Sequence, residues 1–207
     1  ALAPAHGHRM DDLVRHAEAV MRRVKDAGRG SYRVHHKRNE VDRRQHMRLE
    51  YAMRQALVSG RFRLVYQPQV DLVTGQLVGA EALLRWRDPE LGDIPPARFI
   101  PVAEESGFII ALGDWVLSQA VRQATLWHGR GWNVPVAVNV SALQFQQAQF
   151  VERVAQVLAV SGLPPQLLEL ELTESILVQD AEEALARLDR KSTRLNSSHG
   201  YISYAVF

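Results

Sequence analysis

Oxygen-bearing side chains stand at the ends of three apolar segments of this sequence. Glu81 lies in "LVGAEALLRW" (77–86), Asn139 closes the β-branched run "VPVAVNVS", and Glu171 and Glu174 end "LLELELTES". Carboxylate and amide oxygens are hard donors of the kind that Mg²⁺, Mn²⁺ or Ca²⁺ binds. If the three segments are neighbouring strands, these donors would meet at one rim and could hold a metal ion. A second interpretation stays open, in which they only mark where buried strands become loops.

Two further polar residues lie near these positions. Arg85 is four residues past Glu81. Its planar guanidinium could bind a phosphate through paired hydrogen bonds, or it could be an exposed arginine at a strand exit. Gln67 could present its amide at the same rim, or it could make an ordinary hydrogen bond at a strand end.

The elements that would position these residues alternate between strands and helices from Phe62 onward. Two extended segments flank a hairpin-like turn at Thr74–Gly75, and Pro68 disfavours a central place in a sheet for the first of them. We then expect a loop over "RDPELGDIPPARF", a short helical piece to Glu105, a helix from about Asp114 to His128, a strand at "VPVAVNVS", a helix to about Val160, the strand "LLELELTES" and a helix from Asp180. This alternation predicts parallel βαβ units, in either a doubly wound sheet or a barrel.

The first 60 residues predict two helices of a different character. The first opens at Asp11 and ends near Gly28, and the second runs from about Glu40 to Val58 and is stopped by Gly60. We interpret the second helix as a connector between two domains.

Composition and charge narrow the class of protein. The 207 residues are 46% hydrophobic and 23% charged, which is typical of a globular chain. The absence of cysteine excludes disulfides and thiolate metal sites, and no apolar run approaches the ~18 residues of a membrane span.

Residues 1–63 carry 15 Lys and Arg against 7 Asp and Glu, whereas residues 64–207 carry 10 against 16. The basic part could contact nucleic acid or anionic lipid, or it could be a solvated helical linker. It lacks the pattern of a nucleic-acid-binding segment, which favours the linker. The acidic part suits a cation site, although surface acids would look the same.

Four motifs in order carry a family resemblance. The segments "YQPQVDLVTGQLVGAEALLRW", "FIPVAEESG", "VAVNVS" and "LELELTES" closely resemble the EAL-domain family, whose members are cyclic di-GMP phosphodiesterases on a TIM-like barrel. A shorter stretch, "AEAVMRRVKDAGRGSYRV", resembles the last helix and strand of a GGDEF (diguanylate cyclase) domain. The resemblance implies an α/β fold that is the N-terminal part of an incomplete EAL-type (β/α)8 barrel. It divides the chain into a GGDEF-like remnant (1–36), a helical linker (37–60), the N-terminal half of an EAL domain (61–190) and a tail (191–207).

The resemblance also implies roles for the polar residues. Glu81, Asn139 and Glu171 match metal ligands for Mg²⁺ or Mn²⁺, and Gln67 and Arg85 match substrate-contacting positions. Glu174 matches a residue that controls a loop involved in dimerisation and substrate binding. The expected partners are therefore cyclic di-GMP and, in an intact parent, a second copy of the chain, with no nucleic acid. The expected location is the cytoplasm, with membrane attachment of the parent left to upstream domains.

The resemblance stops after "EEALARLDR". A family member should continue towards "DDFGTG", but this chain reads "KSTRLNSSHGYISYAVF" and has no acidic residue after Asp189. The family's paired aspartates and its later Lys, Glu and Gln are therefore absent. We expect a truncated product in which residues 191–207 are artefactual or disordered; the alternative is a divergent natural C-terminus. The resemblance implies hydrolysis of cyclic di-GMP to linear pGpG by the parent, and inactivity of this fragment alone. A non-catalytic EAL module that binds cyclic di-GMP or a protein is the alternative.

Overall fold

The computed structural model describes residues 9–11, 13, 14, 17, 18, 21, 37–173, 193–198 and 201–206. The chain divides into two compact units, residues 1–51 and 52–207. In the first unit, described residues between Met10 and Met21 are helical, as predicted from the acidic start of this segment. Helix α2 (Lys37–Val58) ends before Gly60, which confirms the helix predicted there, while its role as a connector between two domains stays a prediction. None of the described helices is both long and apolar enough to cross a membrane.

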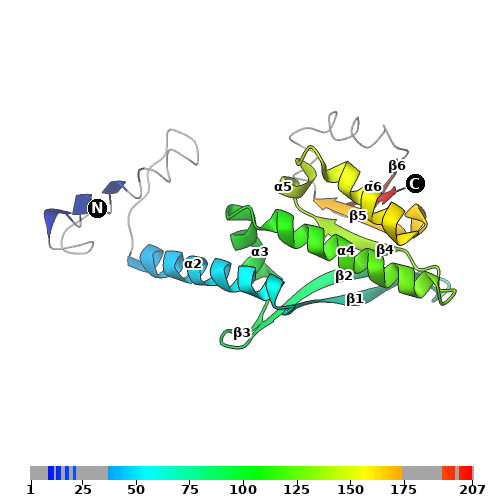
Figure 1. The fold of residues 1–207 in the computed structure, drawn as a ribbon, viewed down its shortest axis with the longest axis horizontal. Helices are drawn as coiled ribbons and strands as arrows, with labels where there is room; N and C mark the ends of the chain where they lie inside the picture. The colour runs from blue at the N-terminus through cyan, green and yellow to red at the C-terminus, as the bar shows by residue number, and fades with distance from the viewer. Residues whose placement is uncertain are drawn as a thin grey trace. The chain divides into compact units, whose positions relative to one another are not determined.

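The second unit builds one mixed sheet with helices between its strands (Figure 1). Its strands are β1 (Phe62–Val70), β2 (Leu77–Asp88), β3 (Gly92–Ile94), β4 (Val136–Val140), β5 (Leu168–Thr173), β6 (Thr193–Ser198) and β7 (Tyr201–Val206). Its helices are α3 (Pro96–Glu105), α4 (Ile109–His128), α5 (Ala142–Phe145), α6 (Phe150–Ser161) and the 3₁₀ turn η1 (Pro165–Leu167).

The strand order of the sheet is β1-β2-β4-β5-β7-β6, and β3 pairs with β2. β2, β4 and β5 are parallel neighbours, which confirms the βαβ units predicted from the alternation of elements. β1 and β2 form the predicted antiparallel hairpin. Its turn is closed by Gly75 at φ 68° and by the Asp71 carboxylate, which accepts hydrogen bonds from the backbone N–H groups of Val73 and Thr74. Pro68 lies in β1 at the edge of the sheet, where its lack of an N–H costs no ladder bond.

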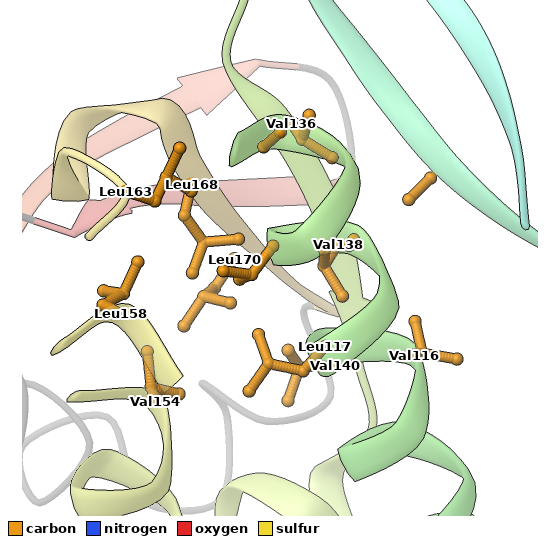
Figure 2. Packing of buried hydrophobic residues seen from close by; sticks show 14 of the residues in the cluster. Val116, Leu117, Val136, Val138, Val140, Val154, Leu158, Leu163, Leu168 and Leu170 are labelled. Atoms are coloured by element: carbon orange, nitrogen blue, oxygen red, sulfur yellow. The ribbon is translucent and has the colours of Figure 1, made fainter. Parts of the chain in front are cut away.

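The hydrophobic core lies between one face of this sheet and the helices α4 and α6 (Figure 2). Alternate residues of each strand face these helices, because side chains of a strand point to opposite faces in turn. The buried core residues of the central strands are Val136, Val138, Val140, Leu168, Leu170 and Leu172, and α4 and α6 contribute Val116, Leu117, Ala120, Val121, Ala124, Val154 and Leu158. The residues between them in the strands belong to the opposite face, which is the face that matters for the site.

Several boundaries differ from the prediction. The segment expected to be a loop after Arg87 contains β3, and α4 begins at Ile109, before the expected Asp114. The helix expected to run to Val160 is two helices, α5 and α6. The expected helix from Asp180 lies outside the described residues.

The tail carries two strands where we expected an artefactual or disordered segment. β7 pairs antiparallel with β5, and β6 pairs antiparallel with β7. The edge of β5, which half a barrel would leave open, is therefore covered by backbone of the tail, since an unpaired strand edge readily accepts another strand. The assignment of residues 191–207 to a tail outside the domain stays a prediction.

Candidate functional site

The site is centred on a hydrogen bond between two neighbouring parallel strands, which joins Asn139 near the end of β4 to Glu81 inside β2. The Asn139 side-chain Nδ2 donates to the Glu81 Oε1 at 2.7 Å. Glu81 of β2 lies level with Ala137 of β4, so Asn139 is two residues further along β4 and on the same face of the sheet. This face is opposite to the one packed on α4 and α6. The two side chains meet as expected, but Glu81 is not at a strand end: β2 continues to Asp88, because the residues after Glu81 still pair with β1 and β3.

Glu171 lies on the next strand and in register with Asn139. The pairing of β4 with β5 puts Asn139 directly opposite Glu171, and strand alternation puts both on the same face. Glu171 is half-buried, whereas Asn139 is exposed in an otherwise buried strand. Glu81, Asn139 and Glu171 therefore form a row of oxygen donors across three parallel strands.

Gln67 lies beside this row on the antiparallel strand. It is directly opposite Glu81 in the β1–β2 ladder, and its side chain is exposed. Gln67 can therefore offer its amide next to the Glu81 carboxylate, although it lies inside β1 and not at the strand end where it was expected.

Arg85 is further from the row. It lies four residues past Glu81 on β2, about 13 Å along the strand, although on the same face. Its guanidinium Nη1 donates to the backbone carbonyl of Leu84 at 2.9 Å. In this conformation Arg85 is bound to its own strand.

Glu169 shares the face of the row and was not singled out from the sequence. It is level with Ala137 and two residues before Glu171. Burial raises the pKa of the Glu169 carboxyl above its ordinary value. The signal that could have found it is the period of two in "LELELT", because a strand that places Glu171 on one face also places Glu169 there.

Within the part of the chain that the structure describes, no group of three or more His, Cys, Asp or Glu side chains could hold a metal ion. The row offers two carboxylates and one amide, and Glu174 lies outside the described residues. Because Asn139 donates its N–H to Glu81, its Oδ1 is left to accept or to bind a cation, and each carboxylate has further lone pairs. The donor types fit a hard divalent cation, and their number is that of a partial site.

Comparison with known proteins decides the family. The family model described as EAL domain matches residues 50–199, which is more than half of the chain. The chain belongs to the EAL domain family. The family predicted from the four motifs is thereby confirmed, and the mixed α/β fold corresponds to part of the EAL barrel. The match starts at residue 50, so the GGDEF-like assignment of residues 1–36 stays a prediction.

Two curated relatives of this EAL chain carry names that state an activity. The bifunctional diguanylate cyclase/cyclic di-GMP phosphodiesterase MucR of Pseudomonas aeruginosa is 40% identical over 195 residues, which are 93% of this chain and 28% of MucR. The cyclic di-GMP phosphodiesterase PdeR of Escherichia coli is 38% identical over 194 residues, which are 93% of this chain and 29% of PdeR. The chain thus spans less than a third of the length of these relatives.

Solved EAL structures share the fold. The PaMucR phosphodiesterase in complex with c-di-GMP superposes with a TM-score of 0.67 at 43% identity, over 69% of this chain and 58% of that one. The FimX EAL domain of Xanthomonas citri in complex with c-diGMP superposes with a TM-score of 0.61 at 27% identity, over 71% of this chain and 58% of that one. Both structures contain the cyclic dinucleotide that the sequence motifs led us to expect as a partner.

Proposed function

We propose that this chain is part of a metal-dependent phosphodiesterase that hydrolyses cyclic di-GMP to linear pGpG in a longer parent protein. The observation that carries the proposal is the hydrogen bond of 2.7 Å between Asn139 and Glu81, on neighbouring parallel strands of a chain in the EAL family. Relatives named as cyclic di-GMP phosphodiesterases support the same reaction. Hydrolysis adds one water across one phosphodiester bond and leaves the other intact.

The proposed cofactor is Mg²⁺ or Mn²⁺, bound by Glu81, Asn139 and Glu171. These residues supply hard oxygen donors on one face of three neighbouring strands, as such ions prefer. When bound, such a cation polarises the phosphoryl oxygens and lowers the pKa of a bound water. The role of the protein is to keep the donors in one row and to orient the Asn139 oxygen by fixing its N–H on Glu81.

The proposed substrate contacts are Gln67 and Arg85. Gln67 is exposed and directly opposite Glu81, where its amide could hydrogen-bond a base or phosphate next to the cation. Arg85 would have to leave the Leu84 carbonyl to form a bidentate pair with a phosphate. Glu174 as a loop and dimer control residue, and the homodimer itself, remain proposals from the family resemblance.

The 207-residue chain alone should not turn over substrate. A two-cation site needs ligands on both sides of the reacting phosphate, and among the described residues Glu81, Asn139 and Glu171 would form one partial set. The alternative function, a non-catalytic module that binds cyclic di-GMP, is favoured by the same observation, because a partial ligand set with Gln67 beside it can bind without catalysing.

The experiment is a paired measurement of turnover and binding on the purified chain. Cyclic di-GMP hydrolysis is followed with Mn²⁺, and calorimetry measures cyclic di-GMP binding with Ca²⁺. We expect no hydrolysis; hydrolysis that Glu81→Ala abolishes would contradict inactivity. Binding that is weakened by Glu81→Gln and unchanged by Glu152→Gln, an exposed glutamate of α6, supports the site. If neither turnover nor binding occurs, both the catalytic-site assignment and the binding alternative fail for this chain.

A further inference from the structure

A buried glutamine is seated on a glycine beside the site. Gln144 of α5 is only 4% exposed, unusual for a polar side chain. A Cβ placed on Gly113 of α4 would lie 2.1 Å from the Gln144 Nε2 and 2.2 Å from its Oε1. The amide of Gln144 therefore occupies the space that any residue other than glycine would fill. Figure 1 shows α5 beside the beginning of α4, in agreement with this contact.

A glycine at position 113 makes helix α4 less stable, which indicates a specific reason for its presence there. It lies inside α4 with ordinary helical backbone, where glycine stabilises a helix less than alanine does. Its left-handed freedom is not used, because its φ is not positive. Close approach of the Gln144 amide is the feature of the structure that requires glycine here.

Asp114, which follows Gly113 in α4, contacts α6, the second helix after β4. The Asp114 carboxylate forms an ion pair with the Arg153 guanidinium of α6. Residues 113 and 114 of α4 thus hold both α5 and α6. Two adjacent anchors on one helix would keep the end of β4 in a defined place.

Gln144 is connected to Asn139 by a short stretch of backbone that contains the N-cap of α5. Ser141, two residues after Asn139, is the N-cap of α5, and its Oγ accepts a hydrogen bond from the Gln144 N–H at 3.2 Å. The backbone N–H of Phe145 donates to the Ser141 carbonyl at 3.0 Å. Gln144 is therefore fixed at its main chain by the cap and at its side chain by Gly113, and the strand end with Asn139 is fixed with it.

We propose that Gln144, seated on Gly113, is a positioning residue that orients the Asn139 amide towards Glu81. This inference rests on the proposed function, because it names how the same site is held in place. Gln144 does not touch the row of donors; it acts through the Ser141 cap and the end of β4. Groups hydrogen-bonded directly to a metal ligand typically change metal affinity by about ten- to a hundredfold when removed, and we expect the lower end of this range for Gln144, which acts through the backbone.

The test is nuclear magnetic resonance of the Asn139 side-chain amide in the full chain, with and without Mn²⁺. The signal is assigned by its loss in Asn139→Ala. Gly113→Ala forces the Gln144 amide out, and Gln144→Ala removes it without a clash. Gly129→Ala is the matched control, because this glycine at the C-cap of α4 has right-handed φ of −63° and its nearest neighbour to a new Cβ is the Thr125 carbonyl at 3.4 Å.

We expect the metal-free Asn139 signals to shift and broaden in Gly113→Ala and Gln144→Ala and to stay unchanged in Gly129→Ala. The Mn²⁺ concentration that broadens the Asn139 signals to half should rise by about tenfold or more in the first two variants. Unchanged Asn139 signals in folded Gln144→Ala would overturn the positioning role. Unfolding of both variants would overturn it too, because the contact would then be a requirement of the fold. If Mn²⁺ does not broaden Asn139 in the unaltered chain, the metal site of the proposed function fails, whereas the metal-free spectra still decide the role of Gln144.

Discussion

The hydrogen bond between Asn139 and Glu81 can be measured as a coupling energy. We would compare the unfolding free energies of four proteins in urea, namely the unaltered chain, Glu81→Ala, Asn139→Ala and the double variant. The cycle cancels effects that each substitution has alone and isolates the interaction of the two side chains. The bond is short, at 2.7 Å, and its acceptor is a carboxylate.

The expected coupling follows from burial as much as from distance. Hydrogen bonds to charged groups contribute about 1.5–3 kcal/mol net where water is excluded, against about 0.5–1.5 kcal/mol for an ordinary bond. Asn139 is exposed and Glu81 is half-buried, so water competes for both groups. We therefore expect a coupling of about 1 kcal/mol, below the range for bonds to charged groups and within that of an ordinary bond.

A second pair in the same chain provides the control. The His128 Nδ1 and the Asn133 Oδ1 are also 2.7 Å apart and exposed, and they lie outside the site. Mn²⁺ should raise the coupling of Asn139 with Glu81, because the ion binds the two together, and should leave that of His128 with Asn133 unchanged. A metal-free coupling of about 0.3 kcal/mol or less for Asn139 and Glu81 would refute the reasoning, since it is within the error of additivity.

Three further predictions concern stability. Leu168→Ala, which truncates a fully buried side chain of β5, should lower the unfolding free energy by about 2–5 kcal/mol, whereas Leu72→Ala, at 95% exposure in the hairpin turn, should change it by less than about 0.5 kcal/mol; urea unfolding measures both. Gly162→Ala should cost about 1–2 kcal/mol, because this residue ends α6 at φ 68° with open space around it, while Gly129→Ala should cost less; thermal unfolding compares them. Burial raises the pKa of Tyr66 from 10.0 to about 12, partly offset by Arg122. The folded chain thus keeps this proton when the unfolded chain releases it, so stability should fall as the pH rises from 10 to 12 and fall less in Tyr66→Phe; equal pH profiles would contradict the assignment.

Local chemistry made the hairpin and the parallel strands predictable. The dipeptide Thr74–Gly75 and the acid Asp71 supply the turn, and alternation of strands with helices requires parallel neighbours. Parallel neighbours bring their carboxyl ends to one edge, which is why Glu81 and Asn139 could be expected to meet. These inferences needed only the order and period of residues.

The break between α5 and α6 could not be predicted in the same way. The residues between the two helices, Gln146 to Gln149, include neither proline nor glycine, so no local signal ends the first helix there. Two side-chain contacts lie at this break: Phe145 packs on Phe150, five residues away, with ring centroids 5.9 Å apart, and Gln144 contacts Gly113, 31 residues away. The contact with Gly113 is tertiary, so it can override helix propensity and leaves no pattern in a short window of sequence.

The strands and the helices determine different properties of the row of donors. The strands determine that Glu81, Asn139 and Glu171 share a face, because register and alternation leave no other arrangement. They do not by themselves determine how the Asn139 amide is turned, because this side chain is exposed and can adopt other rotamers. That orientation depends on where β4 ends, which the Ser141 cap and the seat of Gln144 decide. A substitution in the helical layer should therefore alter the site while the sheet stays intact, and one in a core strand such as Leu168→Ala should weaken fold and site together.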